Sequence, residues 1–417
     1  MTYHGVIRPD TEPEPESLAM DVPPNPSPPA TGATESHLTR RVVLSLLVLG
    51  GALGAVVATA GRPPGPKPVV ALPYPSPTRP AKAHRQPTGP GITHVQDLPP
   101  GPHQLFYATG KVSFPAGVFP LGPGFEFPTS FPVYGELVQK ATALLGSGID
   151  QTILAVPAHT MSKSSAAMIP PQPPAADYAF NDSGTNPLQI LRTDSADLSD
   201  LTVRGTPQRD LYNGIMLYQR RGARVTDVKV TGIPGGNSAN PGETFSINNY
   251  RGTQLHLLRV ELDGLDASGH RVGASGLGNN MGHDLTVEDS YSHDMRYGAG
   301  FTHYKMTGTI TYRRCRSVSN VQPWNFERCG ADGSTSILLE ECEFGPSASP
   351  VHLTVDSDAE GGSCRVRIVD PVFAAIDGRF VVRIHSQYWG QPQVQKRGDI
   401  TLIVNGVPRP DLLGIVS

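Results

Sequence analysis

The chain has 417 residues, with 45 glycines, 42 prolines and only 17% charged side chains. Glycine and proline at this level, with fewer charges than the roughly 25% of an average domain, are typical of a turn-rich β-protein with unstructured flanks. A formal net charge of −3 gives the chain no strong overall electrostatic field. Nucleic acid is therefore not an expected partner.

The N-terminal part of the chain divides into two segments. Residues 1–41 are rich in proline, glutamate and serine, and they bury too little apolar surface to offset the entropy of ordering, so a disordered tail is predicted. Residues 42–61 contain no charge over a length close to the ~20 residues that a helix needs to cross a bilayer. Because Arg40 and Arg41 precede this segment, the positive-inside rule places the tail in the cytoplasm and the rest of the chain outside it.

The apolar segment also resembles an export signal. Residues 39–44 resemble a twin-arginine signal, and Ala58 and Ala60 form an A-x-A cleavage pattern. The tail and the apolar run are both long for such a signal, so a retained single-pass membrane anchor is favoured. Cleavage after Ala60 would instead give a secreted protein.

Two further segments precede the repeats. Residues 62–102 are a proline-rich, basic linker that is predicted to extend as a semi-rigid spacer suited to a polyanionic cell wall. Residues 103–148 form a capping segment in which Leu137, Ala141 and Leu144 recur at helical spacing. We therefore expect a short helix that covers the exposed edge of the next domain.

Residues 149–417 repeat short segments in which apolar and polar residues alternate. One series of apolar positions recurs every 25 to 34 residues, at Leu201, Val228, Leu258, Leu285, Ile310, Ile337, Val366 and Ile400. A second series lies between them, at Leu217, Ile247, Leu277, Phe301, Phe326, Leu353 and Ile384. Period-two alternation predicts strands, and two strand sets per repeat predict coils that stack at about 4.8 Å. The predicted fold is all-β, a right-handed parallel β-helix, because a propeller needs four strands per repeat and a leucine-rich repeat needs helices.

The cysteines support this register. Cys315 and Cys342 are 27 residues apart and each follows its apolar position by five residues, so they are predicted to meet in adjacent coils. A buried pair of thiols is favoured over a disulfide, because a disulfide needs a particular geometry.

Several stretches carry a resemblance, among them "LTVRGTPQRDLYNGI", "GASGLGNN" and "GFTHYKMTGTITYRRCRSVSNVQPWNFERC". Over residues 149–373 the chain resembles the pectate-lyase-like superfamily of β-helices. It is most similar to β-helix proteins of actinobacteria and their phages, some of which are regarded as minor tail or spike components. The resemblance implies polysaccharide lysis, glycoside hydrolysis or non-catalytic glycan binding. The membrane segment departs from the pattern of a tail protein.

Glu327 is the acid best placed on an outward strand face. Asn325 lies beside it, and His352 and Asn248 are predicted on neighbouring coils as substrate-binding residues. Glycoside hydrolysis needs a second carboxylate, at ~5–5.5 Å for retention or ~6.5–9.5 Å for inversion. Asp294, in the loop before its coil, is a candidate for that catalytic partner.

Other candidates border the same predicted groove. Asp356 and Asp358 are alternative carboxylate partners, and Arg296 is available as the basic proton acceptor that a lyase needs. His303 falls at an inward or corner position beside the groove and is included among the catalytic candidates. Trp389, near the C-terminus, is expected to stack on sugar rings.

The dipeptides His283-Asp284 and His293-Asp294 raise the question of a metal site. The first is predicted at a strand entrance and the second in a loop, so they are not expected to meet. With no C-x-x-C pair either, neither a metal nor a cofactor is predicted. Charged residues that alternate with the first apolar series, such as Glu261, are interpreted as a solvated face without function.

The leading hypothesis is a membrane-tethered or exported β-helix that binds cell-envelope or extracellular polysaccharide. Whether it also cleaves the polysaccharide is left open, and if it is an enzyme, it is a hydrolase or lyase. The competing hypothesis is a non-catalytic structural or adhesion module, including a phage-derived spike-like homotrimer. The two differ in whether a groove brings two carboxylates, or a carboxylate cluster and a base, within reach of each other.

Overall fold

The structure is a computed structural model that describes residues 85–98, 105, 108–121, 125–126, 132–133, 136–138, 140–156, 188–191, 197–206, 213–218, 221–234, 244–273, 275–330, 333–356, 363–384, 387–388, 391–392 and 400–416. These ranges belong to one compact unit, Pro68–Ser417, and a second unit, Met1–Lys67, lies outside them. The predicted tail, the predicted membrane segment and most of the linker therefore lie outside the described residues. No helix within the described ranges combines the length and the apolar character needed to cross a bilayer.

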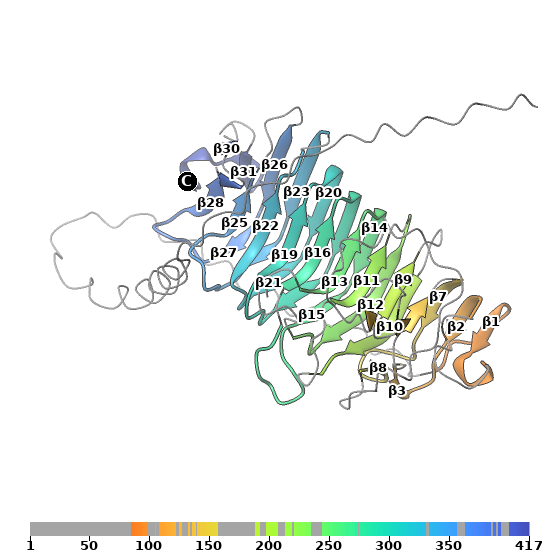
Figure 1. The fold of residues 1–417 in the computed structure, drawn as a ribbon. Helices are drawn as coiled ribbons and strands as arrows, with labels where there is room; N and C mark the ends of the chain where they lie inside the picture. Colours follow the sequence, from red (N-terminus) through yellow and green to blue (C-terminus); the bar gives the residue numbers. More distant parts are fainter. Residues whose placement is uncertain are drawn as a thin grey trace, which may run out of the picture. The chain divides into compact units, whose positions relative to one another are not determined.

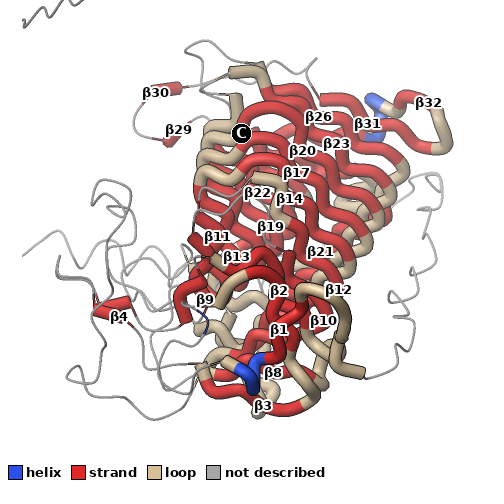
Figure 2. Tube along the Cα trace, turned by 90° about the vertical axis from the view of Figure 1, so that its right-hand side faces the viewer, coloured by secondary structure: helices blue, strands red, loops and turns tan. Residues whose placement is uncertain are grey.

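The described strands wind into a parallel β-solenoid with two main sheets (Figures 1 and 2). A sheet of 10 strands receives one strand from each coil, and we call it the straight sheet. In a sheet of 19 strands, which we call the bent sheet, the chain bends sharply within each coil. The strands before the bend form its first arm, and the strands after the bend form its second arm. The parallel β-solenoid class is thus confirmed, and its right-handed winding stays a prediction.

The bent sheet is made of consecutive coils paired in parallel. Its first arm contains β1 (Ile92–His94), β2 (Gly110–Ser113), β7 (Ala141–Leu145), β14 (Thr253–Leu258), β17 (His283–Glu288), β20 (Thr307–Arg313), β23 (Thr335–Glu340), β26 (Cys364–Val369) and β31 (Ile400–Val404). Its second arm contains β3 (Gly117–Pro120), β8 (Thr152–Ala155), β15 (Glu261–Asp263), β18 (Tyr291–His293), β21 (Arg316–Val318), β24 (Glu343–Phe344) and β27 (Val372–Phe373). Both arms are spanned by β10 (Asp197–Arg204) and β12 (Arg224–Thr231), and β32 (Val407–Pro408) pairs antiparallel with β31.

The straight sheet forms the opposite wall. It contains β6 (Glu136–Val138), β9 (Leu188–Leu191), β11 (Asn213–Tyr218), β13 (Phe245–Tyr250), β16 (Ser275–Asn280), β19 (Ala299–Tyr304), β22 (Gln322–Glu327), β25 (Leu353–Val355), β28 (Phe380–Ile384) and β33 (Leu413–Val416). Outside the two walls lie the antiparallel pairs β4 (Phe125–Glu126) with β5 (Pro132–Val133) and β29 (Gln387–Tyr388) with β30 (Gln391–Pro392), and the 3₁₀ turns η1 (Val95–Asp97) and η6 (Pro410–Leu412).

The bend of the bent sheet is made by one left-handed residue per coil. These residues have φ between 46° and 57° and are Asp200, Asp227, Arg259, Asp289, Arg314, Glu341 and Asp370. Acidic and basic side chains alternate along part of this row. Arg259 donates to Asp227 at 2.7 and 2.9 Å, and Arg314 donates to Asp289 at 2.7 and 3.0 Å. These bidentate ion pairs connect successive coils at the residues whose left-handed backbone conformation is energetically unfavourable.

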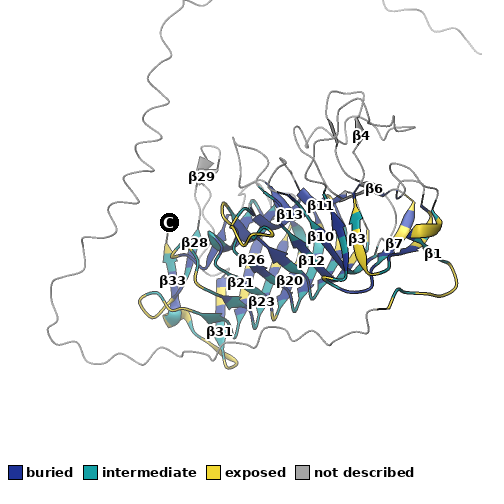
Figure 3. Ribbon diagram, turned by 90° about the horizontal axis from the view of Figure 1, so that it is seen from below, coloured by how far each residue is buried: buried dark blue, intermediate teal, exposed yellow. Residues whose placement is uncertain are grey.

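The interior of the coils is one continuous apolar core, which Figure 3 shows as buried strands. Toward the C-terminal coils it becomes aromatic. Trp324 stacks on Phe301 with ring centroids 4.9 Å apart and contacts Phe344 at 4.4 Å. Phe344 meets Phe380 edge to face at 4.8 Å. Phe301 and Trp324, which are paired in successive coils, therefore touch as the repeat predicts, and Phe344 joins this stack from the bent sheet.

The predicted strand repeat is confirmed with local slips in register. Leu285, Ile310, Ile337, Val366 and Ile400 are paired in sequence, as predicted. The predicted equivalence of Leu258 with Leu285 is wrong, because Leu255 is the residue that pairs with Leu285. Leu258 pairs with Glu288 and faces outward. The alternation identifies the inward residues within one strand, but it does not determine which inward residue of the next coil is the partner.

The straight sheet shows a similar slip of two residues. Trp324, not Phe326, pairs with Phe301, and Phe326 pairs with His303. A shift of two residues preserves the side of the strand. Trp324 and Phe326 are accordingly both fully buried.

The predicted N-terminal helix is wrong. Residues 136–138 form β6 and residues 141–145 form β7, so the described residues that carry the helical spacing lie in strands. Within β7, Ala143 and Leu144 are buried and pair with Lys111 and Val112 of β2. Pairing with the neighbouring coils therefore outweighs the helical spacing of the apolar residues.

The prediction for Cys315 and Cys342 is confirmed. They occupy the same position in adjacent coils, between pairs Arg313↔Glu340 and Arg316↔Glu343, and both are buried free thiols. Burial raises the pKa of Cys315 well above its ordinary value, so the thiol stays protonated.

Candidate functional site

Glu327 is the last residue of β22 in the straight sheet. The Asn325 side chain donates a hydrogen bond to Glu327 Oε1 at 2.5 Å, so these two predicted site residues do meet. Asp356 follows Val355, which pairs with Phe326, so it lies next to Glu327 in the following coil and is buried.

Asp294 and Arg296 lie at the opposite end of the straight sheet. They precede β19, whose last residue, Tyr304, is paired with Glu327. At ~3.3 Å per residue, the length of these strands separates Asp294 from Glu327 by on the order of 15 to 20 Å. The prediction that Asp294 and Arg296 border the groove of Glu327 is therefore wrong. Arg296 is exposed and lies over the Tyr297 ring at 5.0 Å.

His303 and His352 belong to the interior. His303 is fully buried, stacks on Phe326 at 4.6 Å and has the Tyr312 hydroxyl 2.8 Å from its Nε2 atom. His352 is buried, and its Nδ1 accepts a hydrogen bond from the Val381 backbone at 2.9 Å. Burial lowers the pKa of His303 to about 3 and also lowers that of His352. The predictions of a catalytic role for His303 and a substrate-binding role for His352 are not supported by these positions.

Asn248 lies in the middle of β13, where all six residues are buried. Its amide oxygen accepts a hydrogen bond from Asn280 at 2.9 Å. The pair satisfies polar groups within the wall, so the prediction that Asn248 contacts a substrate is not supported by its position. Trp389 and Asp358 lie outside the described residues.

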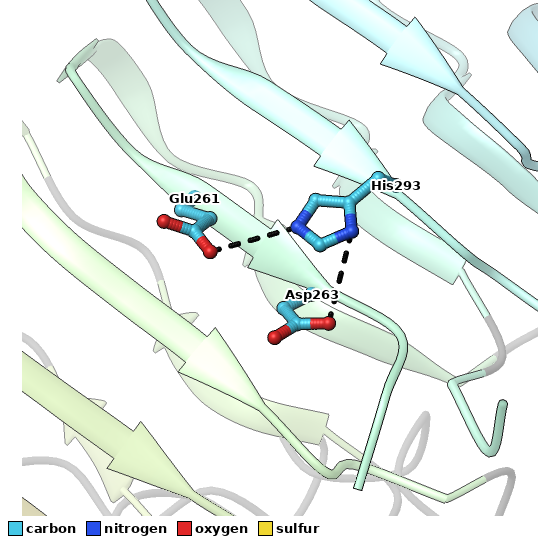
Figure 4. A group of neighbouring side chains, drawn as sticks. All are labelled: Glu261, Asp263 and His293. Carbon is cyan, nitrogen blue, oxygen red and sulfur yellow. Dashed lines mark ion pairs between the residues drawn. The ribbon is translucent and has the colours of Figure 1, made fainter. Parts of the chain in front are cut away.

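A different set of polar residues comes together on the outer face of the second arm. In β15 the order Glu261-Leu262-Asp263 places the two acids outward and Leu262 in the core. In β18 the same alternation places Tyr291 and His293 outward, directly next to Glu261 and Asp263. Figure 4 shows one nitrogen of the imidazole facing Glu261 and the other facing Asp263.

We call Glu261, Asp263 and His293 the acid–histidine cluster. One ligand-type atom from each residue lies within 4.8 Å of those of the other two. The side chains are 21%, 10% and 12% exposed, so the cluster is largely buried but reachable from solvent. Such a combination of two acids and an imidazole can bind a cation, exchange protons or hydrogen-bond a polar ligand.

Lys229, one coil earlier, neutralises part of the acidic charge. Its ammonium group lies 2.9 Å from Glu261 Oε1 and 3.1 Å from Asp263 Oδ2. Burial alone would lower the pKa of Lys229, but hydrogen bonds and charge interactions with the two carboxylates outweigh it, and the pKa is raised.

His293 is held by acids on two sides. Its Nδ1 atom lies 2.9 Å from Asp294 Oδ2, and its Nε2 atom lies 3.6 Å from Glu261 Oε1. Burial alone would lower the pKa of His293, but Glu261, Asp294 and Asp263 outweigh it and raise the pKa. His293 was predicted in a loop, and the structure instead makes it the last residue of a strand.

Tyr291 extends the polar surface along the solenoid. Its ring stacks on His293 with centroids 4.3 Å apart, and the Arg316 guanidinium lies 4.8 Å from its centroid. Arg316 also pairs with Glu343 of the next coil at 2.5 Å. Polar and aromatic groups thus continue outward from the acid–histidine cluster over adjacent coils.

The turn that follows β15 fixes the geometry of this face. A Cβ atom on Gly264 would lie 2.2 Å from the Asp294 carbonyl oxygen, so only glycine allows the two chain segments to come this close. Arg271 then donates to the carbonyl of Met295 at 2.7 Å. The segment beyond His293 is therefore held from both sides.

The acid–histidine cluster was not predicted from the sequence, although the sequence contains a signal for it. The signal was the pair of three-residue segments "ELD" and "YSH", each of which follows a residue that turns the chain at the bend. A strand of three residues is too short for its alternation to be distinguished from a loop.

Comparison with known proteins gives only distant likenesses. No family model matches the chain, and no curated protein matches it. Among solved structures it is similar to the catalytic domain of a GH87 α-1,3-glucanase in complex with tetrasaccharides, with 12% identity, a TM-score of 0.32, and coverage of 74% of this chain and 62% of that one. The A-module of a mannuronan C-5 epimerase from Azotobacter vinelandii has 11% identity, a TM-score of 0.35, and coverage of 78% and 97%. A protein of Geobacillus virus E2, ORF18, has 10% identity, a TM-score of 0.19, and coverage of 70% and 57%.

The chain spans less than two thirds of the glucanase domain that it matches. Identities and TM-scores this low carry nothing about activity. The class of the protein, a parallel β-solenoid, follows from its own strand pairing.

Proposed function

We propose that this β-solenoid binds polysaccharide outside the cytoplasm, on the outer face of the second arm of the bent sheet. The supporting observation is a row of outward polar and aromatic side chains in register from coil to coil: Lys229, Glu261, Tyr291, Arg316 and Glu343. Parallel strands repeat at ~4.8 Å, so the row offers similar groups at regular intervals. A ligand that repeats along its own length can contact such a row at several coils.

The groups in this row suit sugars chemically. Tyr291 and Arg316 offer a hydroxyl and guanidinium N–H groups, and the carboxylates of Glu261 and Glu343 accept hydrogen bonds from hydroxyl groups. The side chains are partly exposed and already held by neighbours, so binding would cost little side-chain entropy.

Binding is favoured over hydrolysis on this face. The nearest carboxylate oxygens of Glu261 and Asp263 lie within 4.8 Å, close to the ~5–5.5 Å separation of retaining glycosidases. A retaining mechanism needs both carboxyl groups free to reach the sugar, whereas oxygen atoms of both are already in contact with the Lys229 ammonium. We therefore assign recognition, and not glycosidic cleavage, to this pair.

The proposed location depends on the sequence alone. Residues 42–61 would form a single-pass anchor with the solenoid outside the cell, or the chain would be secreted after cleavage behind Ala60. Cell-envelope or extracellular polysaccharide is then the proposed partner. The competing function is a structural or adhesion module, including a spike-like homotrimer, which needs no glycan contact on this face.

A panel of neutral and uronic-acid polysaccharides, tested with the full chain, distinguishes these functions. Arg316→Gln should weaken binding by roughly 10- to 100-fold, because a charge-assisted hydrogen bond is lost. Arg367→Gln is the matched control, since Arg367 is exposed on the first arm of the same sheet. No binding to any glycan, or equal loss in both variants, would contradict the proposal.

A further inference from the structure

We propose that Glu261, Asp263 and His293 form a binding site for a divalent transition-metal ion of the zinc class. This inference does not depend on the proposed glycan binding. It rests on the separations within the acid–histidine cluster, on the tautomer of His293 and on the balance of charge around it.

The separation between His293 and Glu261 fits ligands of one ion better than hydrogen-bonded neighbours. The His293 Nε2 atom lies 3.6 Å from Glu261 Oε1, beyond the limit of about 3.2 Å for N–H···O hydrogen bonds. Donor atoms bound tetrahedrally to zinc at 2.0–2.2 Å are roughly 3.3–3.6 Å apart, close to this separation. Asp263 Oδ1 lies 3.8 Å from the other ring nitrogen, Nδ1, and one ligand-type atom from each of the three residues lies within 4.8 Å of the other two.

The tautomer of His293 leaves one nitrogen available. The Nδ1 atom lies 2.9 Å from Asp294 Oδ2 and therefore carries the hydrogen of that bond when the ring is neutral. The Nε2 atom then has its lone pair toward Glu261, and it is buried without a hydrogen-bond partner among the described residues. Metal-binding histidines have this arrangement, with one nitrogen donating to a carboxylate and the other on the metal.

Three carboxylates surround the imidazole of His293. Those of Glu261, Asp263 and Asp294 converge on the ring, and the ammonium of Lys229 contacts the first two. The Arg271 guanidinium nearby donates to the main-chain carbonyls of Met295 and Asp294. Unless Nε2 carries a proton, its lone pair and the Glu261 carboxylate oxygen repel each other. A cation bound at Nε2 would remove this repulsion.

The ligand set indicates the class of ion. One imidazole and two carboxylates suit zinc and its neighbours, whereas calcium and magnesium prefer oxygen ligands alone. Three protein ligands leave a fourth position open to water or to a ligand atom. Lys229 contacts Glu261 Oε1, the same oxygen that faces Nε2, so the ion competes with Lys229 for this oxygen. The contact of Lys229 with Asp263 Oδ2 leaves Oδ1 available to the ion.

The first test is titration of the full chain with Zn²⁺ against a chromophoric chelator, with Co²⁺ absorption as a probe of tetrahedral coordination. His293→Ala should remove one Zn²⁺ equivalent and the corresponding Co²⁺ spectrum. His256→Ala is the matched control, because the His256 imidazole on the first arm lies 3.0 Å from a single carboxylate, that of Glu288. Equal metal content in both variants would overturn the site.

Two further variants act without removing a ligand. Asp294→Asn keeps Glu261, Asp263 and His293 but weakens the orientation of the ring, so affinity should fall by roughly 10- to 100-fold. Lys229→Met removes the competing cation and should tighten Zn²⁺ binding at least about tenfold. Unchanged or weaker binding in Lys229→Met would contradict the assignment of the ion to these carboxylates.

The selectivity of the site is a separate check. Zn²⁺ should raise the melting temperature of the wild type and of His256→Ala, and not that of His293→Ala. Ca²⁺ at the same concentration should have no such effect. Stabilisation by Ca²⁺ and not by Zn²⁺ would overturn the class of ion, and failure of glycan binding would leave all of these measurements unaffected.

Discussion

His293 and His303 are ten residues apart, but His293 faces outward from the second arm of the bent sheet and His303 faces the interior from the straight sheet. Both are mostly buried, with His303 fully enclosed and the His293 side chain 12% exposed. Burial lowers the pKa of His303 to about 3, whereas carboxylates outweigh burial at His293 and raise its pKa. The degree of burial alone therefore does not decide the chemistry of a histidine in this fold. The decisive factor is whether carboxylate side chains lie close to the imidazole.

The largest effect that this comparison predicts is acid destabilisation through His303. Because its pKa in the folded protein is about 3, the buried imidazole stays neutral while the unfolded chain protonates below about 6.5. Its contribution to stability is complete above about pH 6.5 and is lost as the pH falls toward 3, by up to about 1.4 kcal/mol per pH unit. The measurement is the free energy of unfolding in urea from pH 7 to pH 4.

Two variants isolate this effect. His303→Phe keeps a ring against Phe326 and removes the titration, so its stability should fall less steeply with pH than that of the wild type. Phe326→Leu should destabilise by a nearly constant amount and keep the wild-type slope. Equal slopes for the wild type and His303→Phe would show that His303 does not govern acid unfolding.

A smaller effect is expected from a matched pair of tyrosines. Tyr312→Phe removes the hydroxyl next to His303 Nε2 and leaves a buried polar atom unpaired, at a cost of about 1–3 kcal/mol. Tyr291→Phe removes a hydroxyl from the partly exposed outer face and should change stability by less than about 0.5 kcal/mol. Thermal and urea unfolding of both variants test this difference, and similar losses would mean that the two sides of the wall are not distinct environments.

The fold was predictable from the sequence because a parallel solenoid repeats its own signal. The alternation of apolar and polar residues around Leu285, Ile310 and Ile337 recurs at nearly constant steps along the chain. The strand register of one coil therefore predicts that of the next. The segment at Ala141–Leu145 was mistaken for a helix because its strand identity comes from pairing with distant coils. Local spacing contains no information about those partners.

The candidate site was less predictable for a related reason. Glu327 and Asn325 are two residues apart on one strand, so their contact followed from alternation alone. The cluster of Glu261, Asp263 and His293 instead depends on where the chain bends within each coil. That bend is made by left-handed residues of both charges, such as Arg259, rather than by a glycine that could be recognised.

The smallest expected effect concerns Glu327, the residue that the sequence singled out. Glu327→Gln keeps the shape of the side chain and an oxygen that can accept the hydrogen bond from Asn325. Because Glu327 ends a straight-sheet strand, far from the outer face of the second arm, we expect affinity for polysaccharide to stay within about twofold of the wild type. The measurement is the same glycan panel, with Arg316→Gln beside it. If Glu327→Gln lost binding, or lost a polysaccharide-cleaving activity of the parent, while Arg316→Gln kept it, the end of the straight sheet would be the functional face and the second arm would not.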